Sequence, residues 1–98
     1  MKSKDEPNYL IRQRIIHIIN ETVEFVSLTW VGNYRKVIGE MLADKIPNIR
    51  MLALKSVISN RRLLDKGYEG LVYKLKEDND IEIKQVAKEI RIWLYLNI

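Results

Sequence analysis

Only a few residues of this sequence could carry out acid–base chemistry, and their spacing does not favour it. Histidine is the usual proton donor and acceptor near neutral pH, and the single histidine is His17, within Ile-Ile-His-Ile-Ile. A second histidine, which most histidine-based metal sites require, is missing from the sequence. We therefore interpret His17 as a partly buried structural residue of a helix rather than a catalytic one.

Pairs of carboxylates could act as general acid and base without a histidine. Two groups exist, Glu21 with Glu24, and Glu77 with Asp78 and Asp80. Both lie at predicted helix ends or on a polar face, where acidic side chains are usually solvated or cap a helix. The sequence also lacks a Gly-rich phosphate loop, a nucleophile elbow and a His-Glu-x-x-His motif. We therefore expect no enzymatic activity, no metal site and no cofactor.

The composition excludes further classes of protein. None of the 98 residues is cysteine, which excludes disulfides and thiolate metal sites. The N-terminal residues show no signal-peptide pattern, and no run approaches the roughly 20 uncharged apolar residues that span a bilayer. We therefore expect a cytoplasmic protein without a membrane partner. Its richness in Ile, Lys, Arg and Glu would also suit a thermophile.

The net charge of +4 is concentrated in the middle third of the chain. Residues 31–66 carry eight basic and three acidic side chains, whereas the residues before and after them are nearly balanced. Five basic side chains are candidates for contact with phosphate or with an acidic protein: Arg35, Lys36, Arg61, Arg62 and Lys66. A solvated surface is the simpler interpretation, because a charge of this size is common in small domains.

Apolar residues recur at steps of three and four along most of the chain, which predicts helices and almost no strand. The predicted helices run from about 7 to 28, from Asn33 onward, from Pro47 to about Asn60, after Gly67, and after Asp80. Short turns between successive helices predict that neighbours pack antiparallel. We expect an all-α single domain with about five helices.

A shift of 34 residues aligns the last third of the chain with the middle third. The aligned pairs are Tyr34/Tyr68, Val37/Leu71, Ile38/Val72, Met41/Leu75, Asp44/Asp78, Ile49/Ile83, Arg50/Lys84, Leu52/Val86, Ala53/Ala87 and Ile58/Ile92. Apolar matches alone could arise between any two amphipathic helices. The ordered series of aromatic, apolar, acidic, basic and small residues arises less readily by chance, so we interpret it as a repeat.

The segments 34–58 and 68–92 resemble HEAT-like repeats, most closely the short form also found in phycobilisome lyases. In that family an acidic turn is followed by a β-branched residue, a basic residue and an alanine, which here are Asp44, Ile49, Arg50 and Ala53, and then Asp78, Ile83, Lys84 and Ala87. The resemblance implies that Asp44, Arg50, Asp78 and Lys84 form a structural ladder. It also implies that the second helix of each repeat lines a concave face. Lyase activity does not follow, because a shared architecture says little about chemistry.

The predicted fold is therefore a short HEAT-like α-solenoid of about five antiparallel helices, with a plain five-helix bundle as the alternative. We divide the single domain 1–98 into an N-terminal capping helix (7–31), a first repeat unit (33–65) and a second repeat unit (66–98). A stacked repeat normally needs a polar face at each end.

Two segments near the ends of the predicted stack are apolar rather than polar. The last turns of the chain are apolar on nearly every side, which predicts either an interface or a helix packed all round; the candidate residues are Trp93, Leu94, Tyr95, Leu96 and Ile98. The end of the first helix is similarly apolar, and there packing on the first repeat is the favoured interpretation; its residues are Phe25, Val26, Leu28, Trp30 and Val31.

The leading functional hypothesis is a non-enzymatic adaptor or accessory subunit that docks on a larger protein or associates with itself as a homodimer. The alternative is a nucleic-acid-associated factor that uses the basic middle third, alone or within a polymerase-, ribosome- or defence-type assembly. No small-molecule ligand is expected.

Overall fold

The computed structural model describes residues 7–96, and the side chains of residues 8–89. Its five α-helices are α1 (Pro7–Thr22), α2 (Leu28–Leu42), α3 (Pro47–Ser59), α4 (Glu69–Leu75) and α5 (Ile81–Leu96). Two 3-10 helices, η2 (Arg61–Leu63) and η3 (Lys66–Tyr68), connect α3 to α4. The described residues contain no strand, and the all-α prediction with five helices is confirmed.

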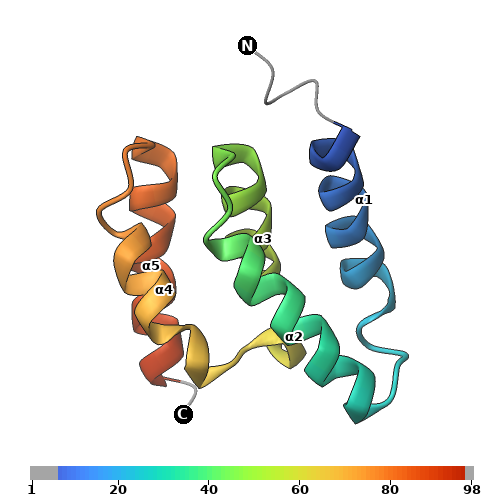
Figure 1. The fold of residues 1–98 in the computed structure, drawn as a ribbon. Coiled ribbons are helices and arrows are strands. Elements are labelled where there is room, and N and C mark those ends of the chain that lie inside the picture. The colour runs from blue at the N-terminus through green and yellow to red at the C-terminus, as the bar shows by residue number, and fades with distance from the viewer. Residues whose placement is uncertain (1–6, 97–98) are drawn as a thin grey trace.

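The helices form two layers. Helices α1, α3 and α5 lie side by side in one layer, and α2 and α4 lie against them in the other (Figure 1). Helix α3 contacts both α1 and α5, while α2 packs on α3 and α4 packs on α5. The pairs α2/α3 and α4/α5 are therefore two neighbouring hairpins, and α1 forms the outer edge of its layer. This arrangement is compatible with a short stack of hairpins and also with a five-helix bundle.

Acidic residues begin α3 and α5, as the sequence predicted. The Asp44 carboxylate accepts a hydrogen bond of 2.9 Å from the backbone N–H of Ile46, just before Pro47 opens α3. At the other hairpin, Asp80 accepts hydrogen bonds from the N–H groups of Glu82 and Ile83 at 2.9 and 3.2 Å. The bonds to Asp80 satisfy N–H groups in the first turn of α5 that have no partner within the helix, whereas Asp44 orders the turn before α3, which begins at a proline.

The boundary between the first two helices differs from the prediction. The first helix ends at Thr22 rather than near residue 28, and the predicted turn at Gly32 lies inside α2, which begins at Leu28. Ser27 caps α2 by accepting a hydrogen bond of 3.4 Å from the N–H of Trp30. Starting there places Val31 in the core with 1% exposure. A surface glycine lowers helix stability by only about 1 kcal/mol, so burial of Val31 decides the boundary.

One hydrophobic core joins all five helices. Its members come from both layers; they are Ile16, Ile19, Val23, Val31, Ile38, Met41, Leu42, Ile46, Ile49, Ala53, Leu54, Val57, Leu63, Tyr68, Val72, Leu75, Ile83 and Ala87. The two alanines aligned by the 34-residue shift, Ala53 and Ala87, are fully buried, where small side chains allow helices to approach closely. Because each hairpin is buried against its neighbour, the helices form one packed unit.

Tyr68 closes the contact between α2 and η3. Its hydroxyl donates a hydrogen bond to the backbone oxygen of Arg35, and its ring lies against Gly39, where an added Cβ atom would approach the ring to 3.2 Å. Burial raises the pKa of the Tyr68 hydroxyl, and the negative charge of Asp65 acts in the same direction while Arg35 opposes it. Tyr68 is therefore a neutral structural donor.

Candidate interaction site

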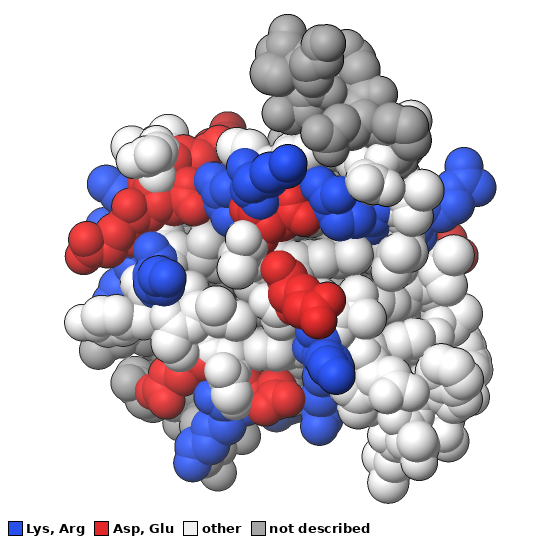
Figure 2. All heavy atoms as spheres, viewed as in Figure 1, with Lys and Arg blue, Asp and Glu red and all other residues white. Residues whose placement is uncertain are grey.

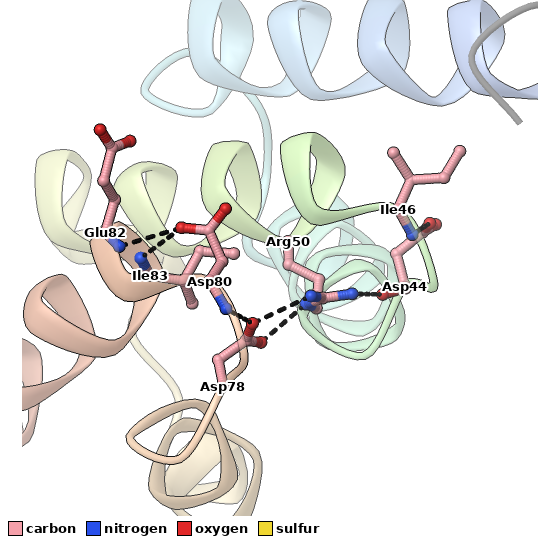
Figure 3. Close-up of polar contacts among 7 residues, drawn as sticks. All are labelled: Asp44, Ile46, Arg50, Asp78, Asp80, Glu82 and Ile83. Atoms are coloured by element: carbon pink, nitrogen blue, oxygen red, sulfur yellow. Dashed lines mark hydrogen bonds and ion pairs between the residues drawn. The ribbon is translucent and has the colours of Figure 1, made fainter.

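A ladder of arginine–aspartate contacts holds the layer of α1, α3 and α5 in register. Arg50 of α3 donates to both carboxylate oxygens of Asp78, from Nε at 2.9 Å and from Nη2 at 3.0 Å (Figure 3). Its Nη1 donates a third hydrogen bond, of 2.8 Å, to the backbone oxygen of Asp44. Arg50 thus connects the turn before α3 to the turn before α5.

A second contact of the same kind was not predicted. Arg12 of α1 forms an ion pair with Asp44, with Nε 2.6 Å from Oδ2 and with Nη2 donating to Oδ1 at 3.1 Å. The Nε–H itself points at neither oxygen, so Nη2 makes the hydrogen bond. Arg12 precedes Arg50 by 38 residues rather than 34, and the 34-residue shift therefore misses it. Helix α1 consequently takes part in the ladder.

The ladder carboxylate Asp78 is poised to stay charged. Burial alone would raise the pKa of Asp78, but the hydrogen bonds from Arg50 and from the N–H of Asp80, together with the charge of Arg50, lower it. The side chains of Arg50 and Asp78 are only 16% and 7% exposed. A carboxylate with a lowered pKa is a poor general acid at neutral pH, so Asp78 acts as a structural anion.

The fourth predicted ladder residue makes no such contact. Lys84 of α5 is half-buried, and its side chain forms no ion pair or hydrogen bond with the described residues. The structure therefore brings together Asp44, Arg50 and Asp78, with Arg12 added, and leaves Lys84 apart.

Two of the five predicted phosphate-contact residues are engaged inside the protein. Arg62 donates to the backbone oxygens of Val23 and Val26, at 2.7 and 3.4 Å, where α1 has ended and its carbonyls lack helical partners. Arg35 donates from Nε to the backbone oxygen of Arg62 at 2.8 Å.

The other three members of this set have exposed side chains. They are Lys36, Arg61 and Lys66, and Arg61 makes a further contact of its own. The five residues thus divide into two half-buried arginines bound to backbone oxygens and three surface cations.

The apolar end of the first helix divides in a way that the sequence did not predict. Val31 is buried and Val26 is half-buried, but Phe25, Leu28 and Trp30 are 85%, 81% and 57% exposed. The prediction that this segment packs on the first repeat is therefore wrong for these three residues. Val31 takes the inward direction of the first turn of α2, which leaves its neighbours pointing outward.

We call Phe25, Leu28 and Trp30 the corner patch. It lies where α1 turns into α2, and Figure 2 shows a broad area without charged residues at this corner, at the lower right. The sequence from Phe25 to Tyr34 contains no charged residue. Trp30 stands beside Tyr34, with 6.5 Å between the ring centroids, and the hydroxyls of Tyr34 and Thr22 share a hydrogen bond of 2.7 Å.

A second apolar surface lies on the outer side of α1. An open groove there is lined by α1 alone, through Leu10, Ile11, Gln13, Arg14, Ile15, His17, Ile18 and Glu21. His17 is exposed in this groove, so the expectation of a partly buried histidine is wrong; Ile16 and Ile19 take the inward positions instead.

The predicted C-terminal interface cannot be placed in the same way. Trp93, Leu94, Tyr95 and Leu96 fall in the last turns of α5, but their side chains lie outside the described part of the chain, as does all of Ile98.

The described residues contain no cluster of metal-ligating side chains and no helix with the length and apolarity needed to cross a bilayer. Comparisons of this chain with protein-family models, with curated proteins and with solved structures found no match.

Proposed function

We propose that this protein is a non-enzymatic interaction module, an adaptor or accessory subunit that docks on a larger protein through the corner patch. The observation that carries the proposal is the exposure of Phe25 and Leu28 beside Trp30 in a segment without charge. Apolar side chains clustered in this way mark interaction sites more often than isolated ones do. Burying three such side chains contributes about 4 to 9 kcal/mol before the costs of association.

The contacts beneath the corner patch support this role, because a surface that is already ordered loses little entropy on binding. Ser27 caps the helix that carries Leu28 and Trp30. Arg62 donates hydrogen bonds to the backbone oxygens of Val23 and Val26, in the turn that precedes α2. Tryptophan is also among the residues that most often dominate binding energy. The corner patch is thus an exposed apolar surface on a turn that Ser27 and Arg62 stabilise by hydrogen bonds.

The surrounding polar residues support a structural rather than a catalytic role. The carboxylates best placed for acid–base chemistry, Asp78 and Asp80, are used by the ladder and by the cap of α5. The ladder contacts of Arg12 and Arg50 also favour the HEAT-like interpretation of the repeat, which remains part of the proposal together with a cytoplasmic location.

The nucleic-acid hypothesis receives less support. A phosphate-binding surface needs several free cations on one face, whereas Arg35 and Arg62 donate to backbone oxygens inside the protein. We therefore do not propose it as a second function.

Two matched substitutions test the proposal. Leu28 and Ile81 are both exposed aliphatic residues at the first position of a helix, where glutamate is favourable to folding. Tagged wild-type protein, Leu28→Glu and Ile81→Glu would be purified from the native host, and the co-purifying chains identified by mass spectrometry. We expect one partner chain to be retained by Ile81→Glu and lost by Leu28→Glu. Retention by Leu28→Glu, or no partner for the wild-type protein, would overturn docking through the corner patch.

A further inference from the structure

The outer side of α1 combines exposed apolar residues with one charge of each sign. Leu10, Ile11 and Ile18 are 58%, 54% and 49% exposed, and Arg14 and Glu21 line the same groove. Helix α1 is the outermost helix of its layer (Figure 1), and its buried residues, such as Ile16 and Ile19, face the other way. An apolar stripe from Leu10 to Ile18, about 12 Å along the helix axis, therefore remains without a partner in the described part of the chain.

Arg14 and Glu21 are free to pair with another molecule. Both are exposed, and neither side chain has an ion pair or hydrogen bond among the described residues. They are seven residues apart, which is close to two turns of helix, so they lie on the same side of α1. Ile18 lies between them on that side.

This arrangement is complementary to itself when reversed. Suppose that a second α1 lies antiparallel to the first, with the two-fold axis between residues 17 and 18. Each residue of one helix then faces a residue of the other helix, and the two residue numbers add up to about 35. Arg14 then faces Glu21 of the second copy, and the two-fold axis makes this pair twice. Ile18 lies at the axis of this pair. A parallel pair would instead place Arg14 against Arg14 and Glu21 against Glu21, which is unfavourable.

We infer that the outer side of α1 binds a second copy of this chain, forming a two-fold dimer through an antiparallel α1 pair. The charge pattern favours this occupant, because a different protein would not require α1 to be complementary to itself. Two-fold dimers are also the commonest protein oligomers. The inference deepens the proposed function, on which it rests, by naming one partner of the interaction module. It uses a surface on α1 next to the corner patch.

The size of this surface sets the expected affinity. One pair of 16-residue helices covers less than the roughly 800 Å² per partner of stable complexes. We therefore expect a dimer that dissociates in the micromolar range, dimeric at high protein concentration and monomeric when dilute. Its dissociation constant should rise with salt, because the two ion pairs are near the surface.

A charge-swap experiment tests the inference. Sedimentation equilibrium of the full chain at about 5 to 500 µM would give the dissociation constant of the dimer. Arg14→Glu or Glu21→Arg alone places two pairs of like charges across the axis and should weaken the dimer at least about tenfold. Combining Arg14→Glu with Glu21→Arg restores both pairs in reverse and should return the constant to within about threefold of wild type.

Controls separate this surface from general effects of charge and folding. Lys88→Glu reverses an exposed charge on α5 and should leave the dissociation constant unchanged, while circular dichroism confirms that every variant is helical. A monomer at all concentrations, or a double variant as weak as the single variants, would overturn the inference. If the wild-type protein is monomeric but loses its host partner on Leu28→Glu, the dimer fails and the proposed function stands. If the charge swap rescues a dimer and no host partner is found, docking through the corner patch fails instead.

Discussion

The sharpest stability prediction concerns Arg50→Ala. This substitution removes two hydrogen bonds to the Asp78 carboxylate and one to the backbone oxygen of Asp44. It also leaves the Asp78 side chain, which is only 7% exposed, without its counter-ion. Breaking a buried ion pair on one side costs about 3 to 5 kcal/mol. Because Arg50 is partly exposed, we expect a loss of about 2 to 4 kcal/mol in the free energy of unfolding.

The loss can be measured by urea unfolding, followed by helical circular dichroism and by tryptophan fluorescence. A domain of this size has a total stability of about 5 to 15 kcal/mol, so the midpoint should fall clearly. Thermal unfolding should also move down by at least about 8 °C, at 4 to 8 °C for each kcal/mol. Arg50→Lys should be intermediate, because lysine keeps the charge but cannot make the two parallel hydrogen bonds.

Lys84→Ala is the matched control, since the 34-residue shift aligns Lys84 with Arg50. Its side chain forms no ladder contact with the described residues, so we expect a change within about 0.5 kcal/mol. Equal losses for Arg50→Ala and Lys84→Ala, or a loss below about 1 kcal/mol for Arg50→Ala, would refute the reasoning. In a double-mutant cycle, Asp78→Ala should cost much less when Arg50 is already alanine.

Three further predictions concern acid stability, helix packing and the turn at residues 23–26. Because the pKa of Asp78 is lowered from its ordinary 3.8 in the folded protein, its stabilising effect is complete above that value and is lost as the pH falls through the folded pKa. Asp78→Asn should therefore flatten the acid limb of a stability–pH curve. Gly32→Ala should stabilise α2 by about 0.5 to 1 kcal/mol, since nothing lies within 4 Å of the added Cβ. The Gly39→Ala variant should be at least about 1 kcal/mol less stable than the Gly32→Ala variant, because the new Cβ meets the buried Tyr68 ring at 3.2 Å. Chemical denaturation of both variants measures the difference in their free energies of unfolding. Arg62→Ala should cost about 1 to 2 kcal/mol and speed hydrogen exchange at residues 23–26, and unchanged exchange would argue against its capping role.

The sequence by itself determined the features that depend on short stretches of chain. The five helices follow from apolar spacing, and the acidic starts of α3 and α5 follow from the position of Asp44 and Asp80 within two or three residues of the N–H groups they bind. The 34-residue shift aligned Arg50 with Lys84 and Asp44 with Asp78. Helix periodicity and the positions of capping residues can be predicted from the sequence because both are local.

The tertiary structure alone decided which sides of the helices are covered. Arg12 meets Asp44 across 32 residues, and Arg62 reaches Val23 across 39; neither contact follows the period of the repeat. The same holds for the exposure of Leu28, which is apolar like the buried Val31 three residues later. Apolar spacing shows that a helix has a side to bury, but only the packed neighbours determine how many sides are buried. Helix α1 has a neighbour in its own layer on one side only, so its outer apolar residues stay uncovered in the described part of the chain.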